Sequence, residues 1–362
     1  MTQGDHQPPA VVLPRWLIVL MGTAAATITI AGLMGASDLI GPVFLALVLT
    51  IAAHPLRGWL QRRHLPGWLA TLIMALTVYT FLFVFGLALV LATAEFASLL
   101  PTYKDQMASA VQDATSWLTT LGVNEAEIET IASSFDVGKL ADLVGGILGG
   151  LLGLLGDVFF IVTLLLFLAV DAAWFPRRLG ETASERGPLV TALSSFASGT
   201  RSYLVVSTVF GLIVAVIDTG LLWVMGIPAP LLWGLLAFIT NYIPNIGFII
   251  GLVPVAVLGF LEGGLGLMLG VIAVYSLVNV VIQSVIQPKV VGDAVGLSAT
   301  LSFLSLVFWA WVLGAVGALL AIPLSLLVKA LFVDIDPSTS WLRPLIGDPA
   351  KPSDQAPTGT SP

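Results

Sequence analysis

The stretch PAPLLWGLLAFITNYIPNIGFIIGLVPVAVLGF, residues Pro228–Phe260, is almost wholly apolar and is long enough to cross a lipid bilayer. Its middle is broken by the polar sequence NYIPNIG, residues Asn241–Gly247. Lipid cannot hydrogen-bond a free peptide group, so non-helical backbone at membrane depth persists only where protein buries it or water lines it. Pro244 removes a backbone donor and disfavours a helical conformation at Ile243, whereas Gly247 lets another backbone or a solute come close.

The break has two interpretations. Half-helices that face each other across such a gap present carbonyl groups on one side and N–H groups on the other, and many transporters hold a solute or an ion in this way. The alternative is a packing kink whose free backbone groups are satisfied by neighbouring helices. The working hypothesis is the first, with the amides of Asn241 and Asn245 facing the solute.

The composition of the whole chain is that of a helical membrane protein. Charged residues make up 10% of the chain and apolar residues 57%, with a mean hydropathy of +1.02, whereas soluble domains have about 25% charged residues. We therefore predict an all-α, polytopic membrane protein with about eight transmembrane helices, one of them broken or re-entrant. The predicted spans are Trp16–Met34, Leu39–Ala53, Trp68–Ala92, Leu148–Ala169, Tyr203–Met225, Leu231–Phe260, Leu265–Ile286 and Thr300–Phe332.

The arginines predict the orientation. They lie before the first span, between the second and third, and between the fourth and fifth, so all fall on one side if every span crosses. The positive-inside rule assigns that side to the cytoplasm, which places both termini there and leaves Lys289 outside as an exception. If Leu231–Phe260 is a re-entrant hairpin, the last two spans invert.

The predicted parts are a cytoplasmic N-terminal segment (1–15), a transmembrane domain (16–333) with amphipathic segments outside (about 95–142) and inside (about 174–202), and a disordered cytoplasmic tail (334–362).

Signatures of enzymes and cofactors are not found in the sequence. The chain has no cysteine, and its three histidines have no zinc-site spacing. Gly138-Lys139 is not followed by the Ser or Thr of a phosphate-binding loop. We therefore predict a protein that is not an enzyme, needs no cofactor or metal, and has no nucleic-acid partner. The net charge of −7 is unevenly distributed along the chain, so it bears on the membrane topology and not on nucleic-acid binding.

Two acidic residues lie inside predicted spans, where a charge is costly and is a functional hypothesis by default. Asp218 has no lysine or arginine within several turns, so it could carry a proton or bind a cation. The alternative is a protonated side chain that hydrogen-bonds a serine or a carbonyl. Asp157, nearer the outer end of its span, is the second candidate.

A polar stripe runs along the seventh predicted span. Tyr275, Asn279, Gln283 and Gln287 recur at steps of four residues, and the helix stops at Pro288. Such a stripe must face protein or water, so it serves either helix–helix hydrogen bonding or a solute-facing wall. The candidate pathway residues are Asn241, Tyr242, Pro244, Asn245, Gly247, Asn279, Gln283, Gln287 and Pro288, and the candidate coupling residues are Asp218 and Asp157.

Several motifs in the second half of the chain resemble the autoinducer-2 exporter family, also known as PerM-like permeases. They are LLWGLLAF (231–238) leading into NYIPNIG (241–247), VIQPKVVG (285–292), FWAWVLG (308–314) and the stretch from Gly317 to Leu324. The first half matches the family only in layout.

The resemblance implies an eight-span transporter of a prokaryotic inner (plasma) membrane that assembles as a homo-oligomer, with a pentamer as the candidate. Its partners would be the lipid bilayer and a small polar solute or ion. The implied activity is secondary transport, either export of a small polar molecule such as autoinducer-2 or exchange of ions or protons. Two alternatives remain open: an oligomeric channel whose pore the same polar wall lines, and a membrane scaffold that recruits partners through the outer helix Leu100–Leu121.

Overall fold

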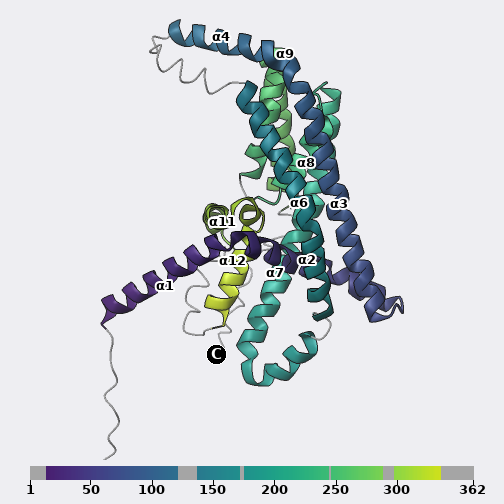
Figure 1. Ribbon diagram of the computed structural model, residues 1–362, viewed down its shortest axis with the longest axis vertical. Coiled ribbons are helices and arrows are strands. Elements are labelled where there is room, and N and C mark those ends of the chain that lie inside the picture. The colour runs from purple at the N-terminus through teal and green to yellow at the C-terminus, as the bar shows by residue number, and fades with distance from the viewer. Residues whose placement is uncertain (1–13, 121–136, 172–174, 244–245, 288–296, 336–362) are drawn as a thin grey trace, which may run out of the picture.

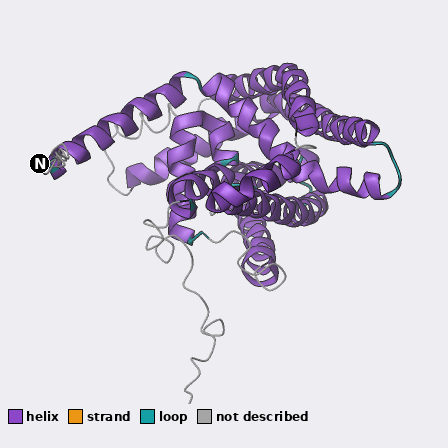
Figure 2. Ribbon diagram, turned by 90° about the horizontal axis from the view of Figure 1, so that it is seen from below, coloured by secondary structure: helices purple, strands orange, loops and turns teal. Residues whose placement is uncertain are grey.

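The computed structural model describes residues 14–120, 137–171, 175–243, 246–287 and 297–335. Within these ranges every regular element is a helix and none is a strand, as Figure 2 shows, which confirms the all-α class. Most of the predicted N-terminal segment and of the predicted tail lies outside the described residues. The elements are α1 (Arg15–Gly35), α2 (Ser37–Arg62), α3 (Gly67–Leu99), η1 (Leu100–Tyr103), α4 (Lys104–Thr120), α6 (Val137–Asp171), α7 (Phe175–Val224), α8 (Pro230–Thr240), α9 (Gly247–Asn279), η2 (Val280–Ile286), α11 (Ala299–Leu319), α12 (Ala321–Lys329) and η3 (Ala330–Asp334).

Six described segments are long and apolar enough to cross a bilayer, and two further apolar helices are shorter. The chain is therefore a multi-pass helical membrane protein, while the count of about eight spans stays a prediction. The six segments are Trp16–Gly35, Ser37–Arg62, Gly67–Gln106, Gly187–Val224, Gly247–Gln283 and Ala299–Leu319, and the shorter helices are Val158–Asp171 and Pro230–Thr240.

The first half of the chain forms a bundle of α2, α3 and α6. Buried side chains from the three helices pack together, among them Ala46, Met74 and Leu165. By contrast, α1 projects away from the other helices, and its apolar stretch is not buried (Figure 1).

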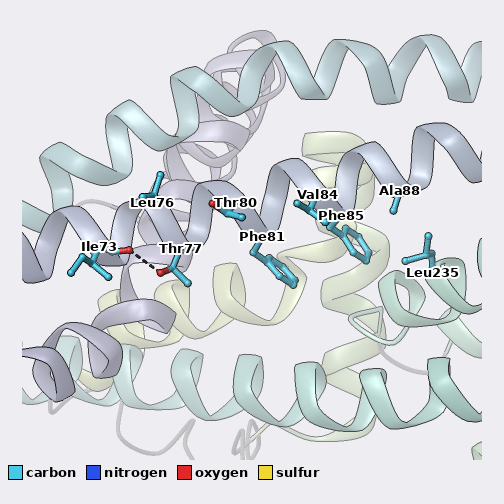
Figure 3. A pocket seen from close by; sticks show the side chains of 9 residues that line it. All are labelled: Ile73, Leu76, Thr77, Thr80, Phe81, Val84, Phe85, Ala88 and Leu235. Carbon is cyan, nitrogen blue, oxygen red and sulfur yellow. Dashed lines mark hydrogen bonds between the residues drawn. The ribbon is translucent and has the colours of Figure 1, made fainter.

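The outer face of α3 carries a shallow apolar groove of about 660 Å³ (Figure 3). Its wall runs along α3 from Ile73 to Ala88 and is completed by Leu235 of α8. The hydroxyl of Thr77 donates to the carbonyl of Ile73 at 2.8 Å, so this donor is already used within the helix. A surface of this chemistry suits lipid acyl chains, and it is separate from the polar residues that the sequence singled out.

The broken segment 231–260 folds back on itself. A Cβ atom placed on Gly251 would lie 4.0 Å from the Cα atom of Ala237, and one placed on Gly247 would overlap the backbone carbonyl of Thr240. Residues 247 and 251 therefore face residues 240 and 237 in reverse order, so α8 and the first half of α9 run antiparallel. The segment is a hairpin whose tip lies between Thr240 and Gly247, and it does not pass through as one helix.

A second reversal divides α9. Gly263 and Gly264 leave the helical conformation, and the φ of +66° at Gly264 lies in the region that glycine adopts readily. Beyond this turn the chain packs back on itself, because a Cβ on Gly259 would lie 3.2 Å from a methyl group of Val271. At the same turn, the hydroxyl of Tyr103 in η1 donates to the carboxylate of Glu262 and ties the outer segment to the hairpin.

The second half of α9 and η2 run antiparallel to α7. A Cβ on Gly270 would approach the methyl group of Met225 at 3.3 Å, near the end of α7. Further along, Ile282 packs with Phe210 and Val214. The chain thus runs back along α7 from Met225 toward the middle of that helix, where Arg201 lies, which is the inversion that a re-entrant hairpin requires.

Labelling of single cysteines will test this topology, since the chain has no cysteine of its own. Ser109 and Ala299 are both exposed positions at or beyond span ends. If the arginine loops are cytoplasmic, we expect a membrane-impermeant maleimide to label Ser109→Cys in intact cells. Because of the hairpin, it should label Ala299→Cys only after the cells are opened. If Ser109→Cys is labelled only in opened cells, the protein has the opposite orientation to the one predicted. If Ala299→Cys is labelled in intact cells, the segment 231–260 does not return to the side from which it enters.

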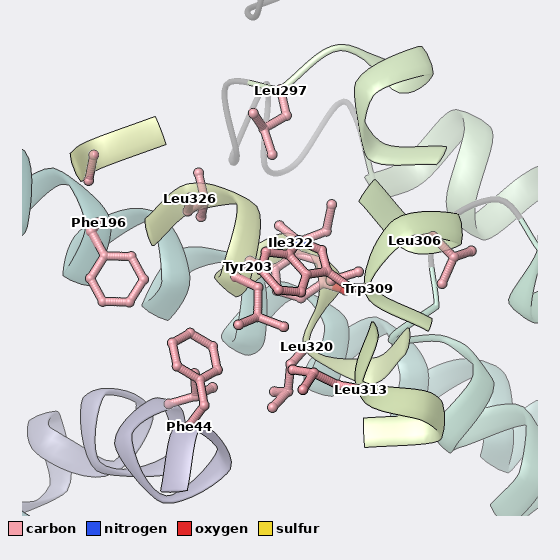
Figure 4. Close-up of a cluster of buried hydrophobic side chains, with 14 of the residues drawn as sticks. Phe44, Phe196, Tyr203, Leu297, Leu306, Trp309, Leu313, Leu320, Ile322 and Leu326 are labelled. Atoms are coloured by element: carbon pink, nitrogen blue, oxygen red, sulfur yellow. The ribbon is translucent and has the colours of Figure 1, made fainter. Parts of the chain in front are cut away.

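The predicted last span, Thr300–Phe332, is not one straight helix, which corrects the prediction. Gly314 adopts a φ of +64° and interrupts the helical conformation within α11. Beyond it α12 returns alongside α11, so that the indole N–H of Trp309 donates to the hydroxyl of Ser325 at 3.0 Å. Figure 4 shows the buried cluster that joins this hairpin to α2 and α7, with Phe44 and Phe196 facing it.

Candidate functional site

The hairpin tip is held against α7 by polar side chains. The amide of Asn241 donates to the carbonyl of Ser207 at 2.8 Å. The hydroxyl of Tyr242 lies 2.6 Å from that of Thr208. The backbone carbonyl of Tyr242 accepts a hydrogen bond from the hydroxyl of Tyr203 at 2.6 Å. Gly211 of α7 leaves the room for this contact, because a Cβ there would lie 2.9 Å from the Asn241 amide nitrogen.

The polar stripe on α9 and η2 meets the same tip. The amide nitrogen of Gln283 donates both to Oδ1 of Asn279 at 2.6 Å and to Oδ1 of Asn241 at 3.1 Å. Asn279 in turn donates to the carbonyl of Tyr275 at 2.9 Å. Gln283 lies in η2, a π-helical segment, and such segments occur frequently at functional sites.

Two buried polar groups next to this network have no hydrogen-bond partner among the described residues. Asp218 is fully buried, and neither of its carboxylate oxygens accepts a hydrogen bond from the part of the chain that the structure describes. Tyr275 is 2% exposed, and within the described ranges its hydroxyl has no hydrogen-bond partner either. Buried polar groups in native proteins are nearly always satisfied by protein, water or an ion, so each exception requires an explanation.

These residues enclose one small cavity between α7, α8 and α9. Its open volume of about 10 Å³ is close to the minimum that holds a single water molecule. Apolar side chains of Val214, Ala237 and Phe248 form part of the wall. The polar lining consists of Asp218, Thr240, Asn241, Tyr275, Asn279 and Gln283.

The structure thus brings together some of the sequence-predicted residues and leaves others apart. Asn241, Asn279 and Gln283 from the predicted pathway share the cavity with Asp218 from the predicted coupling residues. Tyr242 bonds to Thr208 instead, Gly247 packs on Thr240, and Gln287 follows η2 beyond the cavity. Pro244, Asn245 and Pro288 lie outside the described residues, and the side chain of Asp157 on α6 is likewise not described.

Sequence reasoning missed the α7 residues that anchor the tip. A signal existed, because Ser207, Gly211, Val214 and Asp218 recur at steps of three or four residues and so share one face of α7. Ser207 and Thr208 were inconspicuous because a hydroxyl in a span commonly bonds a carbonyl of its own helix, as Thr208 also does with Leu204 at 2.6 Å.

Comparisons with known proteins agree with the sequence motifs. The family described as AI-2E family transporter matches residues 17–335. A putative transport protein of Haemophilus influenzae is 32% identical over 91% of this chain and 96% of its own length. In Escherichia coli, the AI-2 transport protein TqsA is 27% identical over 89% of this chain and 93% of its own length. The putative transport protein YhhT of the same organism is 28% identical over 94% of this chain and 96% of its own length. These names point to transport rather than catalysis, and the chain belongs to the AI-2E transporter family.

Proposed function

We propose that this protein is a secondary transporter of the bacterial inner membrane, with both termini in the cytoplasm. Its substrate would be a small polar molecule of the autoinducer-2 type that it exports, or ions or protons that it exchanges. The observation that carries the proposal is the convergence of Asn241, Gln283 and Asp218 on one buried cavity at the tip of a hairpin. The name of TqsA supports the autoinducer-2 type of substrate for this chain only by similarity.

The proposed path runs between the hairpin tip and the stripe on α9 and η2. Asparagine and glutamine amides each offer two donors and one acceptor group, which suits a solute with hydroxyl and carbonyl groups. In this conformation Gln283 donates to the amide oxygens of both Asn241 and Asn279, and the cavity holds no more than one water molecule. The conformation therefore corresponds to a closed state, and passage of a solute requires these amides to exchange partners as the hairpin moves.

Asp218 is the proposed coupling residue. A buried carboxylate without a partner is stable only when a proton or a cation neutralises it, and no basic side chain lines its cavity among the described residues. Loading and release of that positive charge would favour different positions of the hairpin. Asp157 remains the second candidate, and the homo-oligomer that the family resemblance implies remains part of the proposal.

Reconstitution in liposomes tests the path. We expect saturable flux of the cognate solute, dependent on a proton or sodium gradient, once candidate solutes are screened. Asn241→Ala and Gln283→Ala each remove one member of the amide network, so each should lower the transport rate at least tenfold. The control is Gln106→Ala, which removes an amide from an exposed position.

The outcomes separate the alternatives. Flux that follows the solute gradient without saturation would identify a channel, and absence of flux for every solute screened would favour a scaffold. If Asn241→Ala and Gln283→Ala lose assembled protein in step with transport, the amide network has only a packing role.

A further inference from the structure

A cluster of positive charge lies where α2, α3 and α7 meet, away from the cavity of Asp218. Its charged members are Arg57 of α2 and Arg201 of α7, and the imidazole of His54 of α2 is the third polar group; all three are half-buried. Ile51, His54 and Arg57 succeed one another at steps of three, so they lie along one stripe of α2. Nε of Arg201 donates to the carbonyl of Ile51 at 3.4 Å, which brings the second guanidinium to the same stripe.

The position of Arg57 adds to this excess of positive charge. Its Nε donates to the hydroxyl of Thr71 at 2.9 Å, and one of its terminal nitrogens would lie 3.8 Å from a Cβ placed on Gly67. The guanidinium therefore sits beside the first turn of α3. The N-terminal end of a helix carries partial positive charge and unsatisfied N–H groups, so it disfavours a cation unless an anion is also present.

Nothing in the described part of the chain neutralises this cluster. Lys329 pairs with Asp334, and among the described residues no carboxylate forms an ion pair with Arg57 or Arg201. Each of these guanidiniums uses its Nε–H for the bond described above, and within the described part of the chain the terminal N–H groups of both make no hydrogen bond. Removing such charges from water without a partner is costly.

The surroundings place the cluster at the level of the lipid headgroups. The exposed indoles of Trp59 and Trp68 flank the turn between α2 and α3, and tryptophan is enriched at the membrane–water interface. The guanidinium of Arg63 lies 4.8 Å from the ring centre of Trp59. The turn belongs to the side that the arginine distribution assigns to the cytoplasm.

We propose that His54, Arg57 and Arg201 form a binding site for a phosphate group, with the phosphodiester of an anionic lipid headgroup as its occupant. Two guanidiniums from different helices can each bind phosphate oxygens through paired N–H groups, which is the geometry that favours arginine over lysine for phosphate. Basic pockets between transmembrane helices on the cytoplasmic side are suited to such headgroups. A bound headgroup would tie α7 to the α2–α3 turn. This site is separate from the proposed transport path and does not depend on it.

Lipid binding by the purified full-length protein tests the site. The probes are dioleoylphosphatidylglycerol, dioleoylphosphatidylcholine as the neutral lipid, and sodium phosphate against sodium chloride at equal ionic strength. Native mass spectrometry would measure lipid retention, and thermal unfolding in detergent would measure stabilisation. We expect the phosphatidylglycerol to be retained at least tenfold more strongly than the phosphatidylcholine and to raise the unfolding temperature. Stabilisation by sodium phosphate as well would assign the site to free phosphate in addition to lipid.

The variants make the test specific. Arg57→Gln/Arg201→Gln should lose the preference for phosphatidylglycerol, and Arg62→Gln, which removes a charge from an exposed position of the same helix, should keep it within twofold. Arg57→Lys/Arg201→Lys keeps the positive charge but not the paired donors, so we expect it to retain phosphatidylglycerol at a level between those of the wild type and the glutamine double variant. It also shows whether a loss of binding comes from substitution at these positions as such, through a folding defect, or from the loss of charge. Equal retention by the wild type and the glutamine double variant would overturn the proposal. An equal loss in Arg62→Gln would do the same, since it would indicate a general attraction to anionic surfaces.

Discussion

Asp218→Asn is expected to abolish transport driven by an ion gradient while exchange of substrate at equal concentrations on both sides persists. Asparagine keeps the size of the side chain and its capacity for hydrogen bonds, but it cannot take up a proton or pair with a cation. Exchange needs the path without net ion movement, whereas uphill transport needs a group that is loaded on one side and unloaded on the other. Asp218 is fully buried and has no hydrogen-bond partner among the described residues, so the loss of charge is expected to be the dominant effect of the substitution.

The measurement is uphill accumulation in liposomes over a range of pH, with counterflow as the second assay. Asp105→Asn serves as the control, because it removes a carboxylate at an exposed position of α4. Uphill transport by Asp218→Asn at the unmutated rate, with unchanged pH dependence, would reduce Asp218 to a structural group. Coupling would then have to be sought at Asp157 or in the backbone carbonyls around Asn241.

Composition and spacing were sufficient to predict the fold class and the location of the break. They could not predict that the chain turns back there, because hydropathy is the same for a span that crosses and for one that returns. The direction is set by the contact of Gly247 with the Thr240 backbone, which is a tertiary feature. The reversals at Gly264 and Gly314 were missed for a related reason: the chain has 36 glycines, and the sequence does not mark the few that adopt a positive φ.

The residues of the candidate site were partly predictable from local sequence patterns, but their contacts were not. A four-residue step placed Asn279 and Gln283 on one face of a helix, and the cost of a charge in lipid singled out Asp218. Which residues these would meet depends on the register between α7, α8 and α9, which no local pattern encodes. The amides also bond to one another in the structure, so helix–helix hydrogen bonding and a solute-facing wall are compatible interpretations. Under the proposed mechanism the same groups would bond to one another before the hairpin moves and would face the solute afterwards.

Gly247→Ala is expected to cause the second large effect, a loss of transport together with lower stability. The added methyl group would overlap the carbonyl of Thr240, which is backbone and cannot rotate away, so α8 and α9 must separate at the tip. Overpacking of this kind costs about 1–3 kcal/mol. The tip also carries Asn241, so separation there disturbs the amide network directly. A leucine at this position would test the path less cleanly, because its bulk adds damage to the packing.

Two other glycines of α9 supply the matched controls. At Gly251 a Cβ would lie 3.4 Å from the hydroxyl of Thr240, an ordinary contact, and at Gly266 it would meet open space. Gly251→Ala should therefore change the stability of the protein very little. Gly266→Ala should stabilise the helix by about 0.5–1 kcal/mol, because alanine has less backbone flexibility to lose than glycine. Thermal unfolding in detergent and liposome flux would be measured for all three. If Gly247→Ala unfolds at the wild-type temperature and transports normally, the hairpin does not pack as described. If it is destabilised but still transports, the tip has a packing role, and the path must lie elsewhere on the stripe of Asn279 and Gln283.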